Sequence, residues 1–497
     1  MTKARILPAA LLVAAVAAIN FLWMPGELLT GDPHAWREET RSILVLGGLH
    51  IPIKDGRVVG ERGRYFVQNE RDGLWYSKYG IANSLLALPP MWLERALGKD
   101  VSQPGTPSSL LVLNLWYVGL SVALAALLYS LSGAYSRRAG VRALFVFASL
   151  YCTSLWFYQR AQASELYQTL FFTAFFAALI GFLRPLREQG PAGLSRRAWA
   201  CLGVAWLCAA ALIFTRVIYG LLLPLIVCLA VYCGARWRRL PPLLVPLLVP
   251  PLAIVALLGW VNYVKFGAPW LTGYHQWNEA SHYPVGSLFD GLWGFLFSPR
   301  FSIFLYFPLL IFALAGLRRF AERHRLDALV MLSVFACFLL VLAKTPSWAG
   351  EWSYGPRYLL PMLPVLSLPF LTFADDVIDR VRTWPARAWA AAAISALCYS
   401  AYLQAQVNLL PFWSYYEVRG VLLAARPLES IEYFLNRPTA FVVQDLLRHR
   451  YNVEALPFFS DMARNAPGTF AEHARRELAP MLARNNLYWS LPPAERR

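Results

Sequence analysis

The chain has 497 residues, of which 58% are hydrophobic and only 15% are charged, and its mean hydropathy is +0.44. A soluble protein of this length could not bury so much apolar surface, so the composition excludes that class and indicates a polytopic membrane protein. The formal net charge of +17 would suggest nucleic acid in a soluble protein. Cytoplasmic loops of membrane proteins collect Lys and Arg, however, and we therefore expect no nucleic-acid partner.

Apolar runs long enough to cross a bilayer recur along almost the whole sequence. The first run, residues 6–24, follows Lys3 and Arg5 as a signal peptide would, but it lacks a clean cleavage site. We interpret it as a retained span. The runs together predict an all-α bundle of about eleven transmembrane helices. The expected spans lie near 6–24, 109–132, 141–159, 165–184, 199–216, 218–234, 242–262, 302–317, 328–344, 357–373 and 386–403.

The basic residues between the runs predict the orientation. With the N-terminus inside, every short cytoplasmic loop carries arginines, as the positive-inside rule demands. These are Arg137, Arg138, Arg187, Arg196, Arg197, Arg236, Arg238, Arg239, Arg318, Arg319, Arg323, Arg325, Arg380 and Arg382.

This orientation requires that the apolar run 79–97 does not cross the membrane. Pro89 and Pro90 in its middle remove two backbone donors and disfavour a continuous helix. We expect a juxtamembrane or re-entrant segment on the outer face. If the run did cross, every later side would invert and the arginine clusters would lie outside.

The outer face then receives two large loops, the short segment 345–356 and a tail. Residues 25–108 form the first loop, with juxtamembrane helices, and residues 263–301 form the second. Residues 1–403 are predicted to be the transmembrane module. The more polar tail, 404–497, shows helix-period apolar positions and is predicted to be a small, mostly helical outer domain.

Polar residues that the topology does not explain gather at the outer ends of the predicted spans. A charged group near the centre of a membrane helix costs about 2.5–3.5 kcal/mol, so the position of such groups is informative. A polar face on one side of an apolar bundle indicates a site open both to the outside and to the bilayer. The unexplained groups are Asp32, His34, Glu38, residues 76–80, Glu165, Arg216, residues 262–276, Arg300 and residues 348–361.

Taken together, these segments resemble the bacterial GT-C glycosyltransferases, polytopic enzymes that use polyprenyl-phosphate sugars as donors. An acidic residue follows the first span, and another lies at the mouth of a later span. Between and after them come "WYSKYGIANSLLALPP" (75–90), "NYVKFGAPWLTGY" (262–274) and "GEWSYGPRYLLPMLP" (350–364). The likeness runs through most of residues 1–375 and extends to the broad group that contains aminoarabinose and protein mannosyl transferases. The tail matches no particular subfamily.

The resemblance implies transfer of a sugar from a polyprenyl-phosphate donor to a cell-envelope lipid, polysaccharide or protein on the outer face of the cytoplasmic membrane. Such a transfer needs a carboxylate to orient or deprotonate the acceptor hydroxyl, and cations on the leaving phosphate. Asp32 is the candidate base, and Glu165 is the second acidic residue. The candidates for the phosphate are Lys78, Arg216, Arg300 and Arg357. Further candidates for substrate contact are His34, Tyr76, Tyr79, Lys265, Tyr274, Glu351 and Tyr358.

No metal or other cofactor is expected; the partners are the lipid-linked donor, the acceptor and membrane lipids. His275, Glu279 and His282 have a helical spacing that could bind a metal, but they lie among loop residues that include Pro284 and Gly286.

Each candidate also has a purely structural interpretation. Asp32 before Pro33 suits the start of a helix, and capping would lower the pKa of the carboxylate and make it a weaker base. Glu165 could pair with Arg160 at the membrane edge. Arg216 could simply anchor a turn between two short spans.

Three further cations have similar alternatives. Arg300 and Arg357 could neutralise Asp290 and Glu351, and Lys78 could extend toward anionic headgroups.

A transporter or flippase of a lipid-linked or anionic substrate is the alternative function, and a non-catalytic scaffold of an envelope assembly is a third. A transporter should place ionisable groups near mid-membrane on broken helices, often in repeated halves. The sequence shows neither repeated halves nor convincing mid-span charges, and the dense outer loops disfavour a scaffold. We therefore favour the glycosyltransferase.

Overall fold

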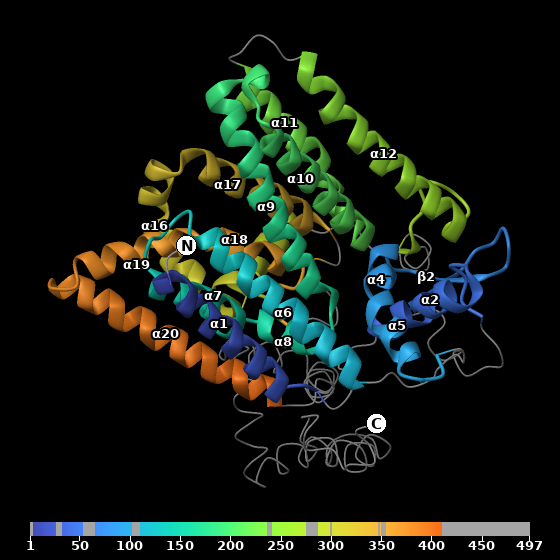
Figure 1. The fold of residues 1–497 in the computed structure, drawn as a ribbon, viewed down its shortest axis with the longest axis horizontal. Coiled ribbons are helices and arrows are strands. Elements are labelled where there is room, and N and C mark those ends of the chain that lie inside the picture. Colours follow the sequence, from blue (N-terminus) through green and yellow to red (C-terminus); the bar gives the residue numbers. More distant parts are fainter. Residues whose placement is uncertain are drawn as a thin grey trace, which may run out of the picture.

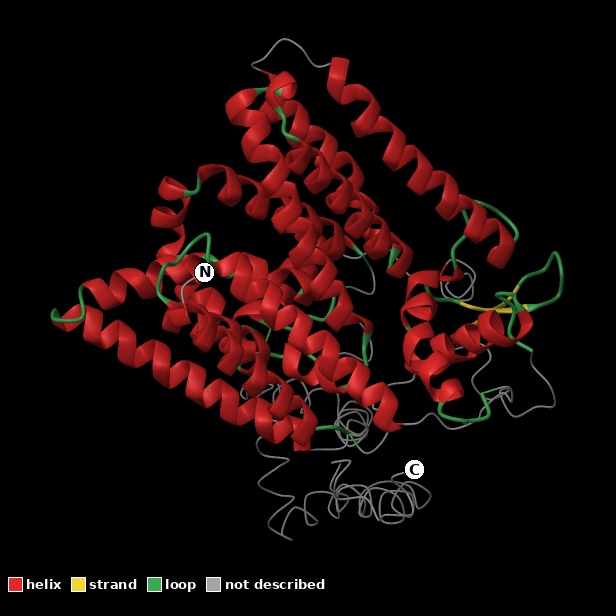
Figure 2. Cartoon of the chain, in the orientation of Figure 1, coloured by secondary structure: helices red, strands yellow, loops and turns green. Residues whose placement is uncertain are grey.

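The computed structural model describes residues 3–25, 32–52, 65–101, 110–235, 241–274, 287–298, 301–345, 348 and 354–409. This part of the chain is helical apart from loops and one two-stranded antiparallel hairpin (Figure 2). The first half holds α1 (Lys3–Leu22), α2 (Asp32–Leu46), β1 (Phe66–Gln68), β2 (Trp75–Ser77), α4 (Ile81–Leu86), α5 (Leu88–Ala96), α6 (Leu110–Ser132), α7 (Ala139–Tyr151), α8 (Leu155–Arg160), α9 (Ser164–Gln189), η2 (Pro191–Gly193), α10 (Arg196–Thr215), η3 (Val217–Leu221) and α11 (Leu222–Gly234). The second half holds α12 (Pro241–Phe266), α14 (Leu288–Phe297), α15 (Ile303–Tyr306), α16 (Leu309–Arg323), α17 (Arg325–Lys344), η5 (Leu360–Met362), α18 (Leu363–Leu366), α19 (Pro369–Asp379) and α20 (Trp384–Leu409).

Seven helical stretches of the described residues are long and apolar enough to cross a bilayer. The chain is therefore a multi-pass, all-α membrane protein, as its composition predicts. The predicted spans 6–24 and 386–403 correspond to α1 and α20, while the total of about eleven crossings stays a prediction. The seven stretches are Leu111–Ser132, Ser164–Gln189, Arg196–Thr215, Val217–Gly234, Pro242–Phe266, Arg325–Lys344 and Leu360–Asp379.

One predicted span, 141–159, is divided into α7 and α8. The hydroxyl of Thr153 donates to the carbonyl of Ser149 at 2.7 Å and accepts from the amide of Leu155 at 3.2 Å. These local bonds offer the backbone an alternative to the helix, which explains the break.

A second predicted span, 302–317, is divided into α15 and α16. The break falls at Phe307, whose φ of −143° and ψ of 68° are far from helical. Phe307 precedes Pro308, and a residue before proline is disfavoured in the helical region.

The run 79–97 forms two short helices, α4 and α5, separated at Ala87. They are only about 9 and 14 Å long, too short to cross a bilayer. On α5, Trp92 and Leu93 are exposed at 63% and 45%, whereas Glu94 is 1% exposed and pairs with Arg37. An apolar exposed side over a charged buried side is typical of a helix against lipid rather than water.

The bundle is built around α9, which packs along α10 and also against α6 and α11 (Figure 1). In the spanning window of α9, 72% of the residues are buried, against 17% for α12. α12 is thus a peripheral helix, and it reaches the first loop at its C-terminal end. There α2, the hairpin, α4 and α5 lie together beside the bundle (Figure 1).

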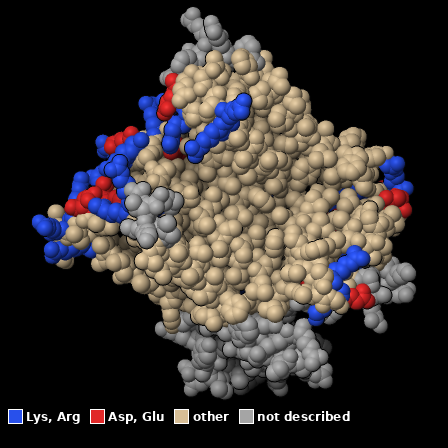
Figure 3. Space-filling view, viewed as in Figure 1, with Lys and Arg blue, Asp and Glu red and all other residues tan. Residues whose placement is uncertain are grey.

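On the face seen in Figure 3, the charged side chains lie toward two ends of the molecule, with a wide uncharged belt between them. At one end, two arginines of the predicted cytoplasmic loops form ion pairs with carboxylates of α19: Arg138 with Asp375 and Asp379, and Arg319 with Asp376. Arg184, the last residue of the predicted span 165–184, pairs there with Asp327. The opposite end contains the first loop.

Candidate active site

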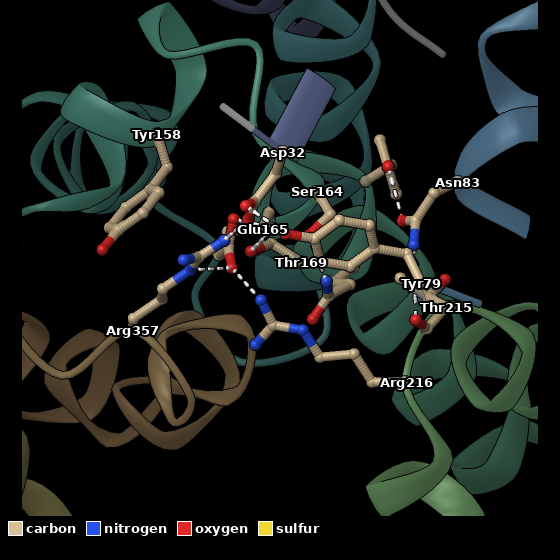
Figure 4. A network of polar contacts seen from close by, with 12 residues as sticks. Asp32, Tyr79, Asn83, Tyr158, Ser164, Glu165, Thr169, Thr215, Arg216 and Arg357 are labelled. Atoms are coloured by element: carbon tan, nitrogen blue, oxygen red, sulfur yellow. Dashed lines mark hydrogen bonds and ion pairs between the residues drawn. The ribbon is translucent and has the colours of Figure 1, made fainter. Parts of the chain in front are cut away.

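Four charged side chains from four separate segments meet in one cluster (Figure 4). The cluster lies at the N-terminal end of α9, opposite the arginine-rich end, where Arg184 lies near the C-terminal end of the same helix. Asp32 is the first residue of α2, and Glu165 lies in the first turn of α9. Arg216 is the extended residue that ends α10, and Arg357 lies in the turn before η5. All four were candidates from the sequence.

The two carboxylates are joined by one guanidinium. Arg357 donates from Nη2 to Asp32 Oδ2 and from Nε to Glu165 Oε1, both at 2.6 Å. Arg216 Nη2 donates to the same Glu165 oxygen at 2.6 Å, and the hydroxyl of Tyr79 donates to Asp32 Oδ1 at 2.5 Å. The formal charges of the two acids and two arginines cancel.

The cluster is buried but not sealed. The side chain of Glu165 is fully buried, whereas those of Asp32, Arg216 and Arg357 keep 18%, 14% and 14% of their exposure. Asp32 and both arginines are therefore accessible to a bound molecule, whereas Glu165 contacts only the arginines of this cluster.

The Arg357 turn is fixed by close packing. Gly355 has φ +66°, and a Cβ there would lie 2.7 Å from the ring of Tyr306, so both the conformation and the space call for glycine. Tyr158 on α8 donates its hydroxyl to the carbonyl of Tyr354 at 3.0 Å and accepts from the amide of Tyr354 at 2.9 Å. These bonds hold the backbone three residues before Arg357.

The first loop closes on the end of α10 at a second glycine. A Cβ on Gly80 would lie 2.1 Å from the carbonyl oxygen of Phe214, so only glycine allows this approach. Asn83 donates to the carbonyl of Thr215 at 3.4 Å and accepts from the hydroxyl of Tyr167 at 2.7 Å. The segment that carries Tyr79 is thereby held beside Arg216.

The electrostatics of the cluster keep Asp32 ionised. Burial favours the neutral acid, but the Arg357 guanidinium, the hydrogen bonds from Tyr79 and Arg357, and the charge of Arg216 outweigh it, so the pKa of Asp32 lies below its ordinary range. Burial and the Asp32 carboxylate raise the pKa of Tyr79 well above its ordinary value. Tyr79 is therefore a neutral hydrogen-bond donor.

Three other candidates surround this cluster. The ring of Tyr358 lies 5.0 Å from the Arg216 guanidinium carbon, and the ring of Tyr274 lies 6.4 Å from that of Tyr79. The ammonium of Lys78 is within 5.4–5.9 Å of the rings of Tyr65, Tyr79 and Tyr274. Lys78 is thus set among aromatic rings at the edge of the cluster.

The remaining candidates are elsewhere. Tyr76 lies on β2 and donates its hydroxyl to Asp72 at 2.8 Å; burial and this contact raise its pKa to about 12. His34 is exposed on α2, and Lys265 is completely buried against Glu39. Arg300 and Glu351 lie outside the described residues, as do His275, Glu279 and His282.

Two of the structural alternatives are wrong. Glu165 pairs with Arg216 and Arg357, while Arg160 donates to the backbone carbonyls of Trp23 and Asn408. Arg216 does more than anchor a turn, because it shares the carboxylate of Glu165. Both oxygens of Asp32 accept from other segments, so its bonds are not confined to the start of α2.

Glu39 was not among the candidates from the sequence, but it is fully buried and forms an ion pair with Lys265 at 2.6 Å. The polar chain next to the cluster was not predicted either; in it, Tyr219 donates to Gln168 at 2.9 Å and Gln168 donates to Ser164 at 2.7 Å. A signal for Glu39 was present, because it lies at position i+7 from Asp32 and therefore on the same face of α2.

The described chain is thus a helical bundle with membrane-spanning helices, and its first loop of short helices brings an acid into a charged cluster at the helix ends. The structure is similar to ArnT from Cupriavidus metallidurans bound to undecaprenyl phosphate, with 14% identity over 98% of this chain and 86% of that chain and a TM-score of 0.53. The apo state of that protein gives 15% identity over 88% and 76% of the two chains and a TM-score of 0.50.

The apo oligosaccharyltransferase of Archaeoglobus fulgidus gives 11% identity, a TM-score of 0.51, and coverage of 86% of this chain and 59% of that one. No protein-family model matches the chain, and no curated protein matches it. At these identities the likeness shows the fold, and it confirms the GT-C fold that the sequence resemblance implies.

Proposed function

We propose that this protein is a glycosyltransferase that moves a sugar from a polyprenyl-phosphate donor to a cell-envelope acceptor, on the outer face of the cytoplasmic membrane. The observation that carries the proposal is the bridge of Asp32 and Glu165 by Arg357, with Arg216 alongside, at the end of the bundle opposite the arginine-rich loops. The fold shared with ArnT, which has been solved with undecaprenyl phosphate, supports this class of donor.

The arrangement supplies the groups that this reaction needs. The acceptor hydroxyl oxygen attacks the anomeric carbon, the bond from that carbon to the phosphate oxygen breaks, and the polyprenyl phosphate leaves with the bonding electrons. Arg216 and Arg357 can stabilise the charge that grows on this phosphate. Asp32, already ionised, takes the proton from the acceptor hydroxyl.

The same arginines make Asp32 a weak base as long as Arg357 holds its carboxylate. A donor phosphate competes with Asp32 and Glu165 for Arg357, because all three are anions within reach of one guanidinium. When Arg357 turns toward the phosphate, the pKa of Asp32 rises and the carboxylate becomes a better proton acceptor. Glu165 keeps its ion pair with Arg216 during this exchange, so that Arg216 stays in place beside the phosphate.

The test is reconstitution of the purified protein with a panel of polyprenyl-phosphate sugars and envelope acceptors. Wild type should form a glycosidic product, and Asp32→Asn should lower the rate about 10²–10⁴-fold, the usual contribution of a general base. Asp375→Asn, which removes a carboxylate from an ion pair at the opposite end, is the control and should transfer normally.

Two results would contradict the proposal. Transfer that survives both Asp32→Asn and Glu165→Gln would refute the assignment of the site. Movement of the lipid-linked substrate across the vesicle membrane without any glycosidic product would instead favour the transporter.

A further inference from the structure

One face of α2 carries both the candidate base and a second buried charge. Asp32, Trp36 and Glu39 occupy positions i, i+4 and i+7, which lie on one side of a helix. Asp32 contacts Tyr79 and Arg357, and the ring of Trp36 lies 5.9 Å from that of Tyr79. Glu39 continues this face away from the cluster and contacts α12.

Glu39 forms a completely buried ion pair with Lys265. Lys265 Nζ lies 2.6 Å from Glu39 Oε1, and neither side chain has any exposure. The other oxygen of Glu39 accepts from the hydroxyl of Ser84 at 2.5 Å, and Lys265 also donates to the backbone carbonyl of Tyr79 at 2.8 Å. The two residues therefore bind each other and the first loop rather than a substrate.

These contacts form a continuous path to Asp32. Lys265 holds the backbone of Tyr79, and the hydroxyl of Tyr79 holds the carboxylate of Asp32. α12 is a peripheral helix of the bundle. The pair of Glu39 and Lys265 joins this helix to the first loop.

We propose that Glu39 and Lys265 are positioning residues, which fix the rotation of α2 and the backbone of Tyr79 so that the Asp32 carboxylate faces the reacting groups. This inference rests on the proposed function. It replaces the expectation that Lys265 contacts the substrate.

The same helix offers a matched control. Arg37 donates to both oxygens of Glu94, at 3.2 and 3.0 Å, and these side chains keep only 7% and 2% of their exposure. This second pair joins α2 to α5. It lies on a different face from Asp32, and the structure shows no bond from it to Tyr79 among the described residues. Breaking either pair disturbs α2, but only the Glu39 pair leads to the reacting carboxylate.

The first experiment compares Glu39→Gln with Glu94→Gln in the full-length protein in lipid nanodiscs, assayed well below the midpoint of thermal unfolding of each variant. We expect Glu39→Gln to lower kcat about 10- to 100-fold, the scale of a misplaced catalytic group, with the donor KM nearly unchanged. Glu94→Gln should keep nearly the wild-type kcat, even if its thermal stability falls as far as that of Glu39→Gln. Equal losses of kcat, or a wild-type kcat in Glu39→Gln, would overturn the inference.

The second experiment exchanges the charges in the double variant Glu39→Lys, Lys265→Glu. The exchanged pair again compensates its charges, but a glutamate at position 265 has no donor for the Tyr79 carbonyl. Thermal stability should return toward wild type relative to the single variants, while kcat stays low. Recovery of kcat together with stability would mean that the pair is only structural.

A third readout does not depend on transfer. The protonation of Asp32 is measured by infrared difference spectroscopy. The spectrum of the Asp32→Asn variant is subtracted from that of wild type, and the spectrum of the Asp32→Asn, Glu39→Gln double variant is subtracted from that of Glu39→Gln. The Asp32 signal should titrate at a higher pH in Glu39→Gln, because the bonds from Tyr79 and Arg357 weaken. If wild type forms no product, the proposed function fails, and this shift alone decides whether the pair positions Asp32. An unchanged titration overturns the inference.

Discussion

The two ends of α9 carry charge in different ways. At its N-terminal end, Glu165 is completely buried and shares two guanidinium groups, one of which also holds Asp32. Near its C-terminal end, Arg184 forms a single pair with Asp327 and keeps 46% of its exposure. The nearby Arg138 is 39% exposed and pairs with Asp375 and Asp379.

The degree of exposure distinguishes the two ends. The exposed arginines at one end include those from which the sequence predicts the cytoplasmic side, and they can interact with solvent and headgroups whether or not a carboxylate is nearby. Buried charges at the other end cannot lose a partner without an energetic penalty. If the two ends are as unlike as the structure indicates, changes in the charged cluster should impair transfer and changes at the arginine-rich end should not.

The largest effect is expected from Arg357→Gln. Two carboxylates lose their shared cation, and breaking a buried ion pair costs about 3–5 kcal/mol. We expect a strong fall in thermal stability and loss of transfer, measured by unfolding in detergent and by product formation. Arg138→Gln at the opposite end is the comparison and should leave transfer unchanged. Similar losses in both variants would remove the distinction between the ends.

Arg357→Lys should lose nearly as much activity as Arg357→Gln. An ammonium is a point charge, whereas the guanidinium donates from Nε and Nη2 to two separate acids. The rate of transfer and the thermal midpoint are the measurements. A lysine variant with the wild-type rate would show that charge alone, rather than the bridge, is required.

The pH dependence of stability should depend on Asp32. Its pKa in the folded protein is below its ordinary value, so its contribution to stability is complete above about pH 5, where the unfolded carboxyl is ionised, and is lost as the pH falls through the lowered folded pKa. The difference in thermal midpoint between wild type and Asp32→Asn should therefore shrink only in acid. A difference that shrinks toward alkaline pH would contradict this assignment.

A smaller effect is expected from Tyr79→Phe, which removes one hydrogen bond to a charged acceptor, worth about 1.5–3 kcal/mol. The kcat should fall about tenfold if part of that bond is used to orient Asp32. Tyr76→Phe, on the hairpin and bonded to Asp72, is the matched control. A larger loss of kcat in Tyr76→Phe than in Tyr79→Phe would contradict this prediction.

The smallest effect is expected from Arg318→Gln at the arginine-rich end. Arg318 is 91% exposed, and its pair with Glu322 is an exposed i, i+4 contact. Pairs of this kind contribute little to stability. Neither the thermal midpoint nor transfer should change measurably, and a clear change in either would show that this end has a role beyond orientation.

The sequence was sufficient to identify the kind of fold and most of the charged site, because both depend on where polar residues interrupt apolar runs. Asp32, Glu165, Arg216 and Arg357 were recognisable as charges that the topology did not explain. Their pairing was not predictable. Arg160 is near Glu165 in the chain, but Gln162 between them has φ +45° and the chain turns there, so Arg160 joins other segments.

The ion pair of Glu39 and Lys265 also could not be predicted from the sequence. The residues come from segments far apart in the chain, and their contact depends on how α12 meets the first loop. The breaks near Thr153 and Phe307 have local causes that can be recognised once the structure is known. In the sequence, each break lies inside a continuous apolar run, so hydrophobicity alone predicts one unbroken span at each place.

The exposed side of α5 has a consequence for the depth of the site. Trp92 and Leu93 face outward from α5, which packs against α2, and α2 begins at Asp32. The candidate base is therefore attached to an element whose height is set by the lipid around it. Hydrophobic mismatch becomes a variable of the reaction: a bilayer with shorter or longer acyl chains would move α5, and with it the level at which Asp32 meets a donor headgroup.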